Sequence, residues 1–219
     1  MIHKKQPYGE NEEKYALLME KKMEKRISKL ENREKSIETK FYTPCDITRI
    51  FSVVKDNYLH RIWLKLLFAY GLTLSELVNI RVRDIDFENN IIKINSSKKM
   101  RHRTLPLPKC LYNELKRESN HKSPDDLLFK GRSKEGKIHL RTVQKIFEKL
   151  YHFTGMEVSV SKIRRTTAIH LLQCGWEEKS ITQLLGHSHL RTTKKLIGSN
   201  RKFYLQVDFP IDKILENAA

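Results

Sequence analysis

Three stretches of the sequence hold the residues best suited to contact a phosphate group. They are the basic run SSKKMRHRTLPL, the arginine pair in SKIRRTT, and the segment LLGHSHLRTTKKLIGSN. Arginine presents a fork of N–H donors that matches phosphate oxygens, lysine adds a compact positive charge, and histidine can donate a hydrogen bond or transfer a proton. We therefore expect a phosphate-binding face formed by Lys98, Lys99, Arg101, Arg103, Arg164, Arg165, His187, Arg191 and Lys194.

The charge of the whole chain favours a polyanionic partner. Its 219 residues include 43 Lys and Arg against 26 Asp and Glu, a formal net charge of +17 at pH 7. Each phosphate that a Lys or Arg neutralises releases counterions, so this excess favours nucleic acid and argues against a small neutral substrate. The alternative is that the lysines simply cover solvated faces of the fold.

Cysteine and histidine usage gives no sign of a metal or cofactor site. His170 and Cys174 are four residues apart, but no second pair has metal-ligand spacing, so we interpret both as buried packing residues. We expect no cofactor and no metal. The odd number of cysteines, at wide spacings, argues against a disulfide framework. No apolar run approaches the roughly 18 residues of a membrane span, so we expect a cytoplasmic protein with no membrane partner.

The elements that must position these residues are mostly helices. Residues 10–40 contain no Gly or Pro and are rich in Glu, Lys, Leu and Met, which predicts one long charged helix. A new helix is expected after Thr43, because Thr43 suits an N-cap and Pro44 suits the first helical position. The pattern predicts this helix at residues 46–57. Further helices are predicted at residues 58–71, 73–85, 108–119, 140–153, 161–175 and 177–186.

One segment breaks the helical pattern. Residues 90–107 have two apolar, β-branched runs on either side of a basic middle, which predicts a β-hairpin with a cationic tip. The expected fold class is therefore mainly α with a small β-hairpin or sheet. We divide the chain into a charged helical arm at residues 1–40, a domain at residues 41–205, and a C-terminal tail at residues 206–219 that is expected to be helical.

Three separated blocks resemble, in order and spacing, the catalytic domain of the tyrosine recombinase (phage integrase) family. They are AYGLTLSELVNIRVRDIDFE, INSSKKMRHRTLPLP and VSKIRRTTAIHLLQCGWEEKSITQLLGHSHLRTT, and the resemblance covers residues 41–203. It implies the catalytic-domain fold of that family, double-stranded DNA as the partner, and association with the nucleoid. Members of the family attack a DNA phosphodiester with a tyrosine and form a 3′-phosphotyrosyl link without a metal.

The resemblance also implies which positions carry the chemistry. Lys98 falls on the hairpin lysine that protonates the leaving 5′ oxygen, Arg164 on the second arginine, and His187 on the histidine of the Leu-Gly-His turn. The arginines of the family contact the non-bridging phosphate oxygens, where negative charge develops. Arg164 is therefore expected to be an exposed phosphate clamp.

Three other positions depart from the family pattern. The first arginine is replaced by Thr73, the histidine that opens the second box by Ser161, and the tyrosine expected nine residues after His187 by Leu196. Thr73 has an interpretation of its own, since Thr73 to Glu76 fits the capping box S/T-x-x-E that begins a helix. Without a nucleophilic oxygen no covalent intermediate forms, so we expect no strand cleavage.

The sequence leaves three functions open. The first is a DNA-binding protein that has lost cleavage and acts as a transcription regulator or accessory factor. The second is a divergent recombinase whose nucleophile is Tyr204, eight residues past the expected position. The third is an interaction protein whose N-terminal helix or C-terminal tail binds a partner recombinase or a second copy of the chain. Residues 177–198 alone also resemble a helix-turn-helix DNA reader, but the three-block match accounts for the same residues.

Overall fold

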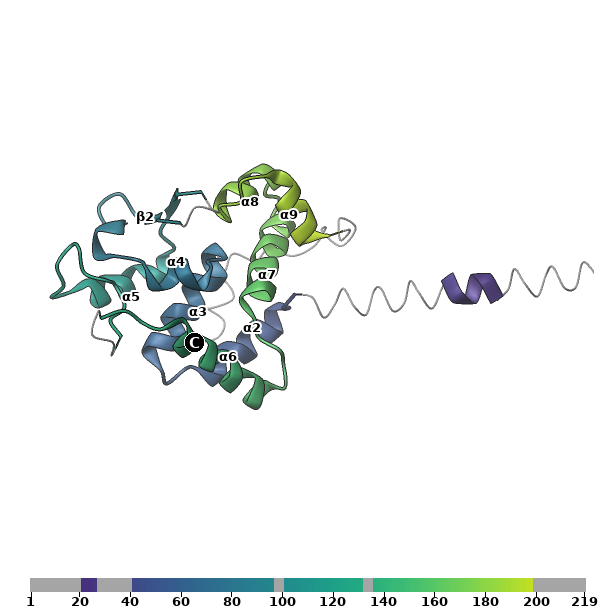
Figure 1. Ribbon diagram of the computed structural model, residues 1–219, viewed down its shortest axis with the longest axis horizontal. Coiled ribbons are helices and arrows are strands. Elements are labelled where there is room, and N and C mark those ends of the chain that lie inside the picture. Colours follow the sequence, from purple (N-terminus) through teal and green to yellow (C-terminus); the bar gives the residue numbers. More distant parts are fainter. Residues whose placement is uncertain (1–20, 27–40, 97–100, 132–135, 199–219) are drawn as a thin grey trace, which may run out of the picture. The chain divides into compact units, whose positions relative to one another are not determined.

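The computed structural model describes residues 21–26, 41–96, 101–131 and 136–198 (Figure 1). The chain divides into two units, Met1–Thr39 and Lys40–Ala219, and each is described by itself. In the first unit, residues 21–26 are helical and exposed. The rest of the long helix predicted near the N-terminus and the predicted C-terminal tail lie outside the described residues.

The second unit is built mainly from helices, with one small antiparallel sheet in the strand order β1-β2-β3. The predicted fold class, mainly α with a small hairpin or sheet, is confirmed. Among the helices of the described ranges, none is long and apolar enough to cross a membrane. The elements are α2 (Pro44–Val53), α3 (Tyr58–Tyr70), α4 (Leu74–Val78), η1 (Val82–Asp84), β1 (Ile85–Asp86), β2 (Ile91–Ile94), β3 (Arg103–Pro106), α5 (Lys109–Ser119), α6 (Leu140–Thr154), α7 (Val160–Gln173), α8 (Glu178–Leu184) and α9 (Leu190–Ile197).

The hairpin predicted in residues 90–107 is formed by β2 and β3. Ile92 pairs with Leu105, and both side chains are buried, while the neighbouring Lys93 is exposed on the other face of the strand. The sequence pattern does not predict β1, which pairs with the first half of β2. A strand of two residues is too short to show the alternation that identifies strands in a sequence.

The first helix of this unit begins where its sequence predicts. The side chain of Thr43 accepts from the Asp46 N–H at 3.2 Å, and the Asp46 carboxylate accepts from the Thr43 N–H at 2.9 Å, which completes a capping box. The helix ends at Val53, earlier than the predicted residue 57, because the side chain of Asn57 already caps α3. One predicted helix is thus a shorter helix followed by a turn.

The helix predicted at residues 73–85 is wrong over its second half. After α4 the chain forms only the short 3-10 helix η1 and bonds to a distant loop: Ile80 O accepts from the Leu128 N–H at 2.8 Å, and the Val82 N–H donates to Asp126 O at 3.1 Å. The β-branched residues of this stretch favour such an extended path. The sequence pattern missed this because the partner loop is distant along the chain.

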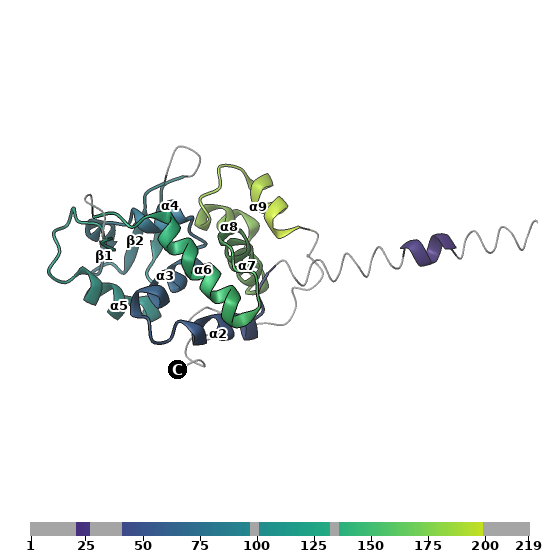
Figure 2. The same ribbon diagram turned by 60° about the horizontal axis from the view of Figure 1, so that its bottom comes forward.

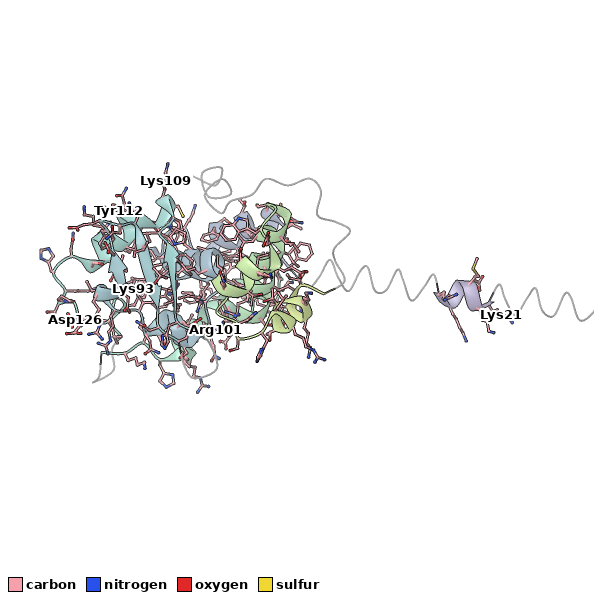
Figure 3. The ribbon with its side chains drawn as sticks, turned by 90° about the horizontal axis from the view of Figure 1, so that it is seen from above. Lys21, Lys93, Arg101, Lys109, Tyr112 and Asp126 are labelled. Atoms are coloured by element: carbon pink, nitrogen blue, oxygen red, sulfur yellow. The ribbon has the colours of Figure 1, made fainter. Side chains whose placement is uncertain are left out.

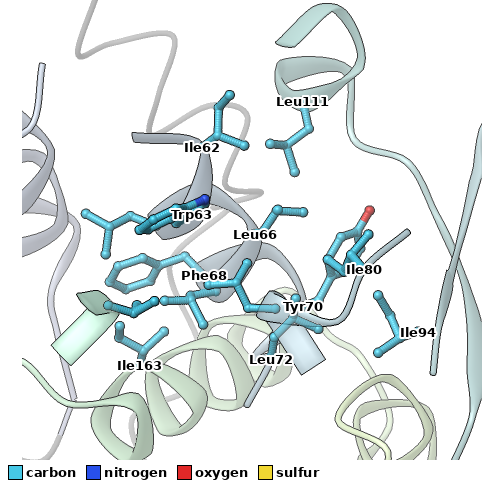
Figure 4. Close-up of a cluster of buried hydrophobic side chains, with 14 of the residues drawn as sticks. Ile62, Trp63, Leu66, Phe68, Tyr70, Leu72, Ile80, Ile94, Leu111 and Ile163 are labelled. Atoms are coloured by element: carbon cyan, nitrogen blue, oxygen red, sulfur yellow. The ribbon is translucent and has the colours of Figure 1, made fainter. Parts of the chain in front are cut away.

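Helix α3 lies at the centre of the hydrophobic core, between Leu111 of α5 and Ile163 of α7 (Figure 4). A buried hydrogen bond of 2.8 Å from Thr167 Oγ1 to Phe68 O adds a polar link between α7 and α3. Figure 2 shows α6 running across the unit between α4 and α2. The buried residues of α3 are Ile62, Trp63, Leu64, Leu66, Leu67, Phe68 and Tyr70.

Helix α3 ends at Gly71, which brings the backbone close to the turn after α8. Gly71 has a left-handed φ of 55°, and a Cβ atom there would lie 2.5 Å from Leu185 Cδ2. Glycine therefore meets two requirements at this position, the backbone conformation and the close approach. The junction matters for function because the polar site described below is built around it.

We predict that Gly71→Ala destabilises the fold more than Gly155→Ala. Both glycines have positive φ, 55° and 69°, so each substitution carries left-handed strain of about 1–2 kcal/mol. Only at position 71 would the added methyl group meet buried atoms, at a further cost of about 1–3 kcal/mol, since nothing lies within 4 Å at position 155. Urea denaturation of both variants measures the difference. Equal losses would show that Leu185 moves aside freely.

Candidate nucleic-acid interface

A buried carboxylate, that of Glu76, connects the start of α4 to the hairpin. Its Oε2 accepts from the Thr73 N–H at 2.8 Å and from Thr73 Oγ1 at 3.0 Å, so position 73 serves as a helix N-cap, as predicted. Its Oε1 accepts from Arg103 Nη1 at 2.6 Å and from the Ser96 hydroxyl. Glu76 is 3% exposed, so protein donors replace water at both oxygens.

Arg103 lies in a buried ion pair with Glu76, and its expected contact with phosphate stays a prediction. The two side chains are 6% and 2% exposed. Burial alone would raise the pKa of Glu76, but the hydrogen bond and the charge of Arg103 outweigh it, so this pKa lies below its usual value. The partners are 27 residues apart in the sequence, and only the folded hairpin brings them together.

The turn that carries His187 packs directly on this ion pair. Gly186 has a φ of 69°, and a Cβ atom there would lie 2.5 Å from Arg103 Nη1 and 3.1 Å from Arg101 O. The carbonyl oxygen of Gly186 also accepts from the Arg101 N–H at 2.9 Å. The absence of a side chain at Gly186 therefore lets the Leu-Gly-His turn lie against the cationic strand of the hairpin.

Arg164 of α7 lies inside the site rather than on its surface, so the expected exposure of this residue is wrong. Arg164 is 8% exposed. Its Nη1 donates to Gly71 O, while its Nη2 donates to Leu185 O at 3.1 Å and lies 2.9 Å from His187 Nε2. Burial lowers the pKa of Arg164 to about 10, which still leaves the guanidinium charged at neutral pH. Its contacts join α7 to the ends of α3 and α8.

His187 contacts Arg164, so the structure brings two of the predicted site residues together. His187 is 7% exposed, and its Nδ1 lies 2.9 Å from Thr193 Oγ1 of α9, which in turn lies 2.8 Å from Thr182 Oγ1 of α8. Burial, with repulsion from the charges of Arg164 and Arg103, lowers the pKa of His187 to about 4. The ring is therefore neutral at pH 7 and can accept a hydrogen bond from Arg164.

The other positions that depart from the family pattern lie in ordinary structural settings. Ser161 is exposed in the first turn of α7, which is capped by Ser159. Leu196 is partly buried and packs against the core. Its carbonyl oxygen accepts from Arg165 Nε at 2.8 Å, so Arg165, expected on the phosphate-binding face, is directed at the C-terminal end of α9.

Some of the predicted cationic residues do lie on the surface. Arg101, Arg191 and Lys194 are exposed, and Lys194 approaches Glu178 at 3.6 Å. Figure 3 shows Arg101 beside the segment that contains α8 and α9. Of these exposed cations, Arg101 donates its backbone N–H to Gly186 O, in the turn that carries the buried His187. The predicted residues that lie outside the described ranges are Lys98, Lys99 and Tyr204.

Sequence reasoning misses two parts of this site. It identifies Glu76 only as a helix cap and does not pair it with Arg103, and it assigns no role to Thr182 and Thr193. A usable signal for the threonines was present, because both fall among apolar residues of their helices, where a hydroxyl group requires a partner. The Glu76 pair has no such signal, since it depends on long-range contacts.

The comparison with known proteins agrees with the fold. The Phage integrase family model matches residues 40–201, and the chain belongs to that family. It is 31% identical to the tyrosine recombinase XerA of Pyrococcus furiosus over 159 residues, 71% of this chain and 56% of that protein. It is 36% identical to a tyrosine recombinase of Pseudothermotoga lettingae over 157 residues, 70% of this chain and 54% of that protein. The chain thus spans about half the length of these relatives.

Solved structures give the same fold. The crystal structure of XerA recombinase matches with a TM-score of 0.62 and 20% identity, over 81% of this chain and 61% of that chain. The Tn1549 transposon integrase, in complex with a circular intermediate DNA, matches with a TM-score of 0.60 and 17% identity, over 81% of this chain and 65% of that chain. The tyrosine recombinase catalytic-domain fold expected from the three sequence blocks is confirmed.

We predict that Arg164→Ala destabilises the domain by about 2–4 kcal/mol, because it leaves two buried carbonyl oxygens and His187 without their donor and opens a cavity. Arg191→Ala, which removes an exposed arginine from α9, is the matched control and should change the free energy of unfolding by less than about 0.5 kcal/mol. Urea denaturation followed by circular dichroism measures both. Similar values for the two variants would contradict the structural role of Arg164.

Proposed function

We propose that this chain is a DNA-binding protein on the tyrosine recombinase fold that contacts DNA phosphates without cleaving the strand. The observation that carries the proposal is Leu196, which stands nine residues after His187, where the family pattern places the nucleophilic tyrosine. Leu196 follows Thr193 by one helical turn of α9 and packs against the core. A leucine side chain offers no oxygen that could attack phosphorus.

Two further positions weaken any remaining chemistry. Thr73 caps α4 and donates to Glu76, so it adds no guanidinium to the site, and Ser161 places a short hydroxyl where the family pattern has an imidazole. Removal of one preorganised donor from a site that stabilises developing negative charge costs about 10²–10³ in rate. These losses would slow an enzyme, whereas the loss of the nucleophile removes the covalent intermediate altogether.

Binding to DNA is supported independently of cleavage. The exposed cation Arg101 lies on the hairpin, where its N–H donates to Gly186 O in the turn after α8, and the exposed cations Arg191 and Lys194 lie on α9, which follows that turn. The net charge of +17 supplies a long-range attraction to a polyanion. The Tn1549 integrase, whose structure has this fold, was determined with DNA bound. We extend that partner, double-stranded DNA, to the present chain.

We also propose two processes in which such a protein would take part. A DNA-binding domain without cleavage would act as a transcription regulator or as an accessory factor in a recombination complex. In the second role it would pair with an active recombinase, or with a second copy of itself, through the N-terminal helix or the C-terminal tail. Because the chain spans about half of its relatives, these roles are inferred from the domain and not from a whole protein.

We predict duplex DNA binding that weakens steeply as salt is raised. Each phosphate contact contributes roughly one unit to the slope of log K against log salt. The double variant Arg101→Ala with Arg191→Ala should therefore lower the slope by about two. Lys109→Ala should leave it unchanged, because Figure 3 labels this exposed lysine on the opposite side of the view from Arg101. Fluorescence anisotropy at several salt concentrations gives the slopes. Absent or salt-independent binding would favour the protein-interaction alternative.

We predict no covalent protein–DNA product when the chain is incubated with a nicked suicide substrate, because position 196 lacks a nucleophile. Leu196→Tyr alone should not restore the product, since Thr73 still leaves the site without one guanidinium. A band from the unmodified protein that is lost in Tyr204→Phe would overturn the proposal and establish the divergent recombinase. Denaturing gel electrophoresis, with DNA binding measured on the same preparation, provides the readout.

A further inference from the structure

The hydrogen bonds around His187 determine which of its ring nitrogens carries the proton. A guanidinium group has only donors, and Arg164 Nη2 lies 2.9 Å from His187 Nε2. The Nε2 atom must therefore act as the acceptor, which requires that it carry no hydrogen. Because neutral imidazole has one N–H, that hydrogen lies on Nδ1.

The same reasoning extends through two threonines. His187 Nδ1 lies 2.9 Å from Thr193 Oγ1 and donates to it. Thr182 Oγ1 lies 2.6 Å from Glu178 O, which can only accept, so the hydroxyl hydrogen of Thr182 points at that carbonyl group. The Oγ1 atoms of Thr193 and Thr182 are 2.8 Å apart, so Thr193 donates its own hydrogen to Thr182. The donors thus run in one direction from Arg164 to the backbone of α8.

Burial makes this order of donors strict. Thr193 is 0% exposed, His187 7% and Thr182 9%, so water does not replace a missing partner within the chain of hydrogen bonds. The pKa of His187, lowered to about 4 by burial, keeps the ring neutral at pH 7, as the order of donors requires. Loss of one hydroxyl group would leave its buried neighbours unpaired and would leave Arg164 alone to select the tautomer.

We propose that Thr193 and Thr182 are positioning residues that fix His187 in its Nδ1–H tautomer, so that His187 holds the Arg164 guanidinium in place for phosphate contact. In the opposite tautomer an N–H would face the Arg164 N–H across 2.9 Å, and the two donors would repel each other. The tautomer of His187 is a property of the protein without DNA. The statement about phosphate contact rests on the proposed function.

The chain offers a matched control for Thr193. Thr192 is its neighbour on α9 and has the same side chain, but Thr192 is exposed whereas Thr193 is buried. Thr193→Val removes the hydroxyl group and keeps the shape of the side chain, and Thr192→Val makes the same chemical change outside the site. Thr193→Ser keeps the hydroxyl group and should retain the wild-type tautomer, which separates the hydrogen bond from packing.

The first experiment is a two-bond ¹H–¹⁵N correlation spectrum of the histidine rings at pH 7, without DNA, with the His187 signals assigned by their loss in His187→Gln. We expect a protonated Nδ1 and an unprotonated Nε2 in the wild type, Thr192→Val and Thr193→Ser. In Thr193→Val the buried Nδ1–H loses its acceptor, so we expect the ring to move away from Arg164 and a population of the Nε2–H form to appear beside the Nδ1–H form. A wild-type His187 protonated at Nε2, or a tautomer unchanged in Thr193→Val, would overturn the inference.

The second experiment measures duplex DNA affinity for the same variants, each checked for folding by its thermal transition. Thr193→Val should raise Kd by about tenfold, because it disturbs the hydrogen bond from the charged Arg164 to His187. Thr192→Val and Thr193→Ser should leave Kd unchanged. Unchanged affinity in a folded Thr193→Val with an altered tautomer would overturn the positioning role. If the wild type shows the expected tautomer but binds no DNA, the proposed function fails and the tautomer assignment stands.

Discussion

The structure depends on one constraint, that the buried guanidinium group of Arg164 must have acceptors on every side. A buried cation without partners would be too costly to keep, and in this fold three acceptors come from two segments: Gly71 O at the end of α3, and Leu185 O with His187 Nε2 in the turn after α8. The need to bring them to one point fixes where α3 ends and how the turn after α8 is oriented. It also explains why a glycine with positive φ occurs at position 71, where a methyl group would collide with Leu185.

The ion pair of Glu76 and Arg103 extends the same principle to the hairpin. The carboxylate uses one oxygen to cap α4 through Thr73 and the other to bind Arg103, so a single side chain fixes both the start of a helix and the position of a strand. The turn at Gly186 then lies on Arg103 and receives a backbone hydrogen bond from Arg101. The guanidinium groups of Arg103 and Arg164 therefore share one buried polar region, and their charges contribute to the low pKa of His187.

The sequence predicts those parts of this arrangement that depend on nearby residues. Capping boxes, the hairpin and most helices follow from local patterns, and Thr43 and Thr73 act as N-caps as expected. The prediction of exposure was wrong for Arg164, because side-chain type indicates what a residue can bind but not which backbone carbonyl group will reach it. The helix predicted at residues 73–85 was wrong over its second half for the same reason, since that half bonds to a loop that is distant in the sequence.

Two residues at positions of the family's active-site pattern also have a structural role in this fold. Arg164 and His187 match the family pattern, yet each is buried and makes hydrogen bonds that the folded domain requires. These hydrogen bonds contribute to the stability of the fold, so the presence of the two residues does not by itself imply catalysis. Leu196, where we propose that the family's nucleophile is missing, packs against the core, and its backbone carbonyl group accepts a hydrogen bond from Arg165. Under that proposal the domain lacks the reacting oxygen and keeps the surrounding polar framework, because the framework is part of the fold. In the proposed function, phosphate contact then involves both Arg164 in this framework and the exposed cations at its edge, whose identity the fold does not constrain.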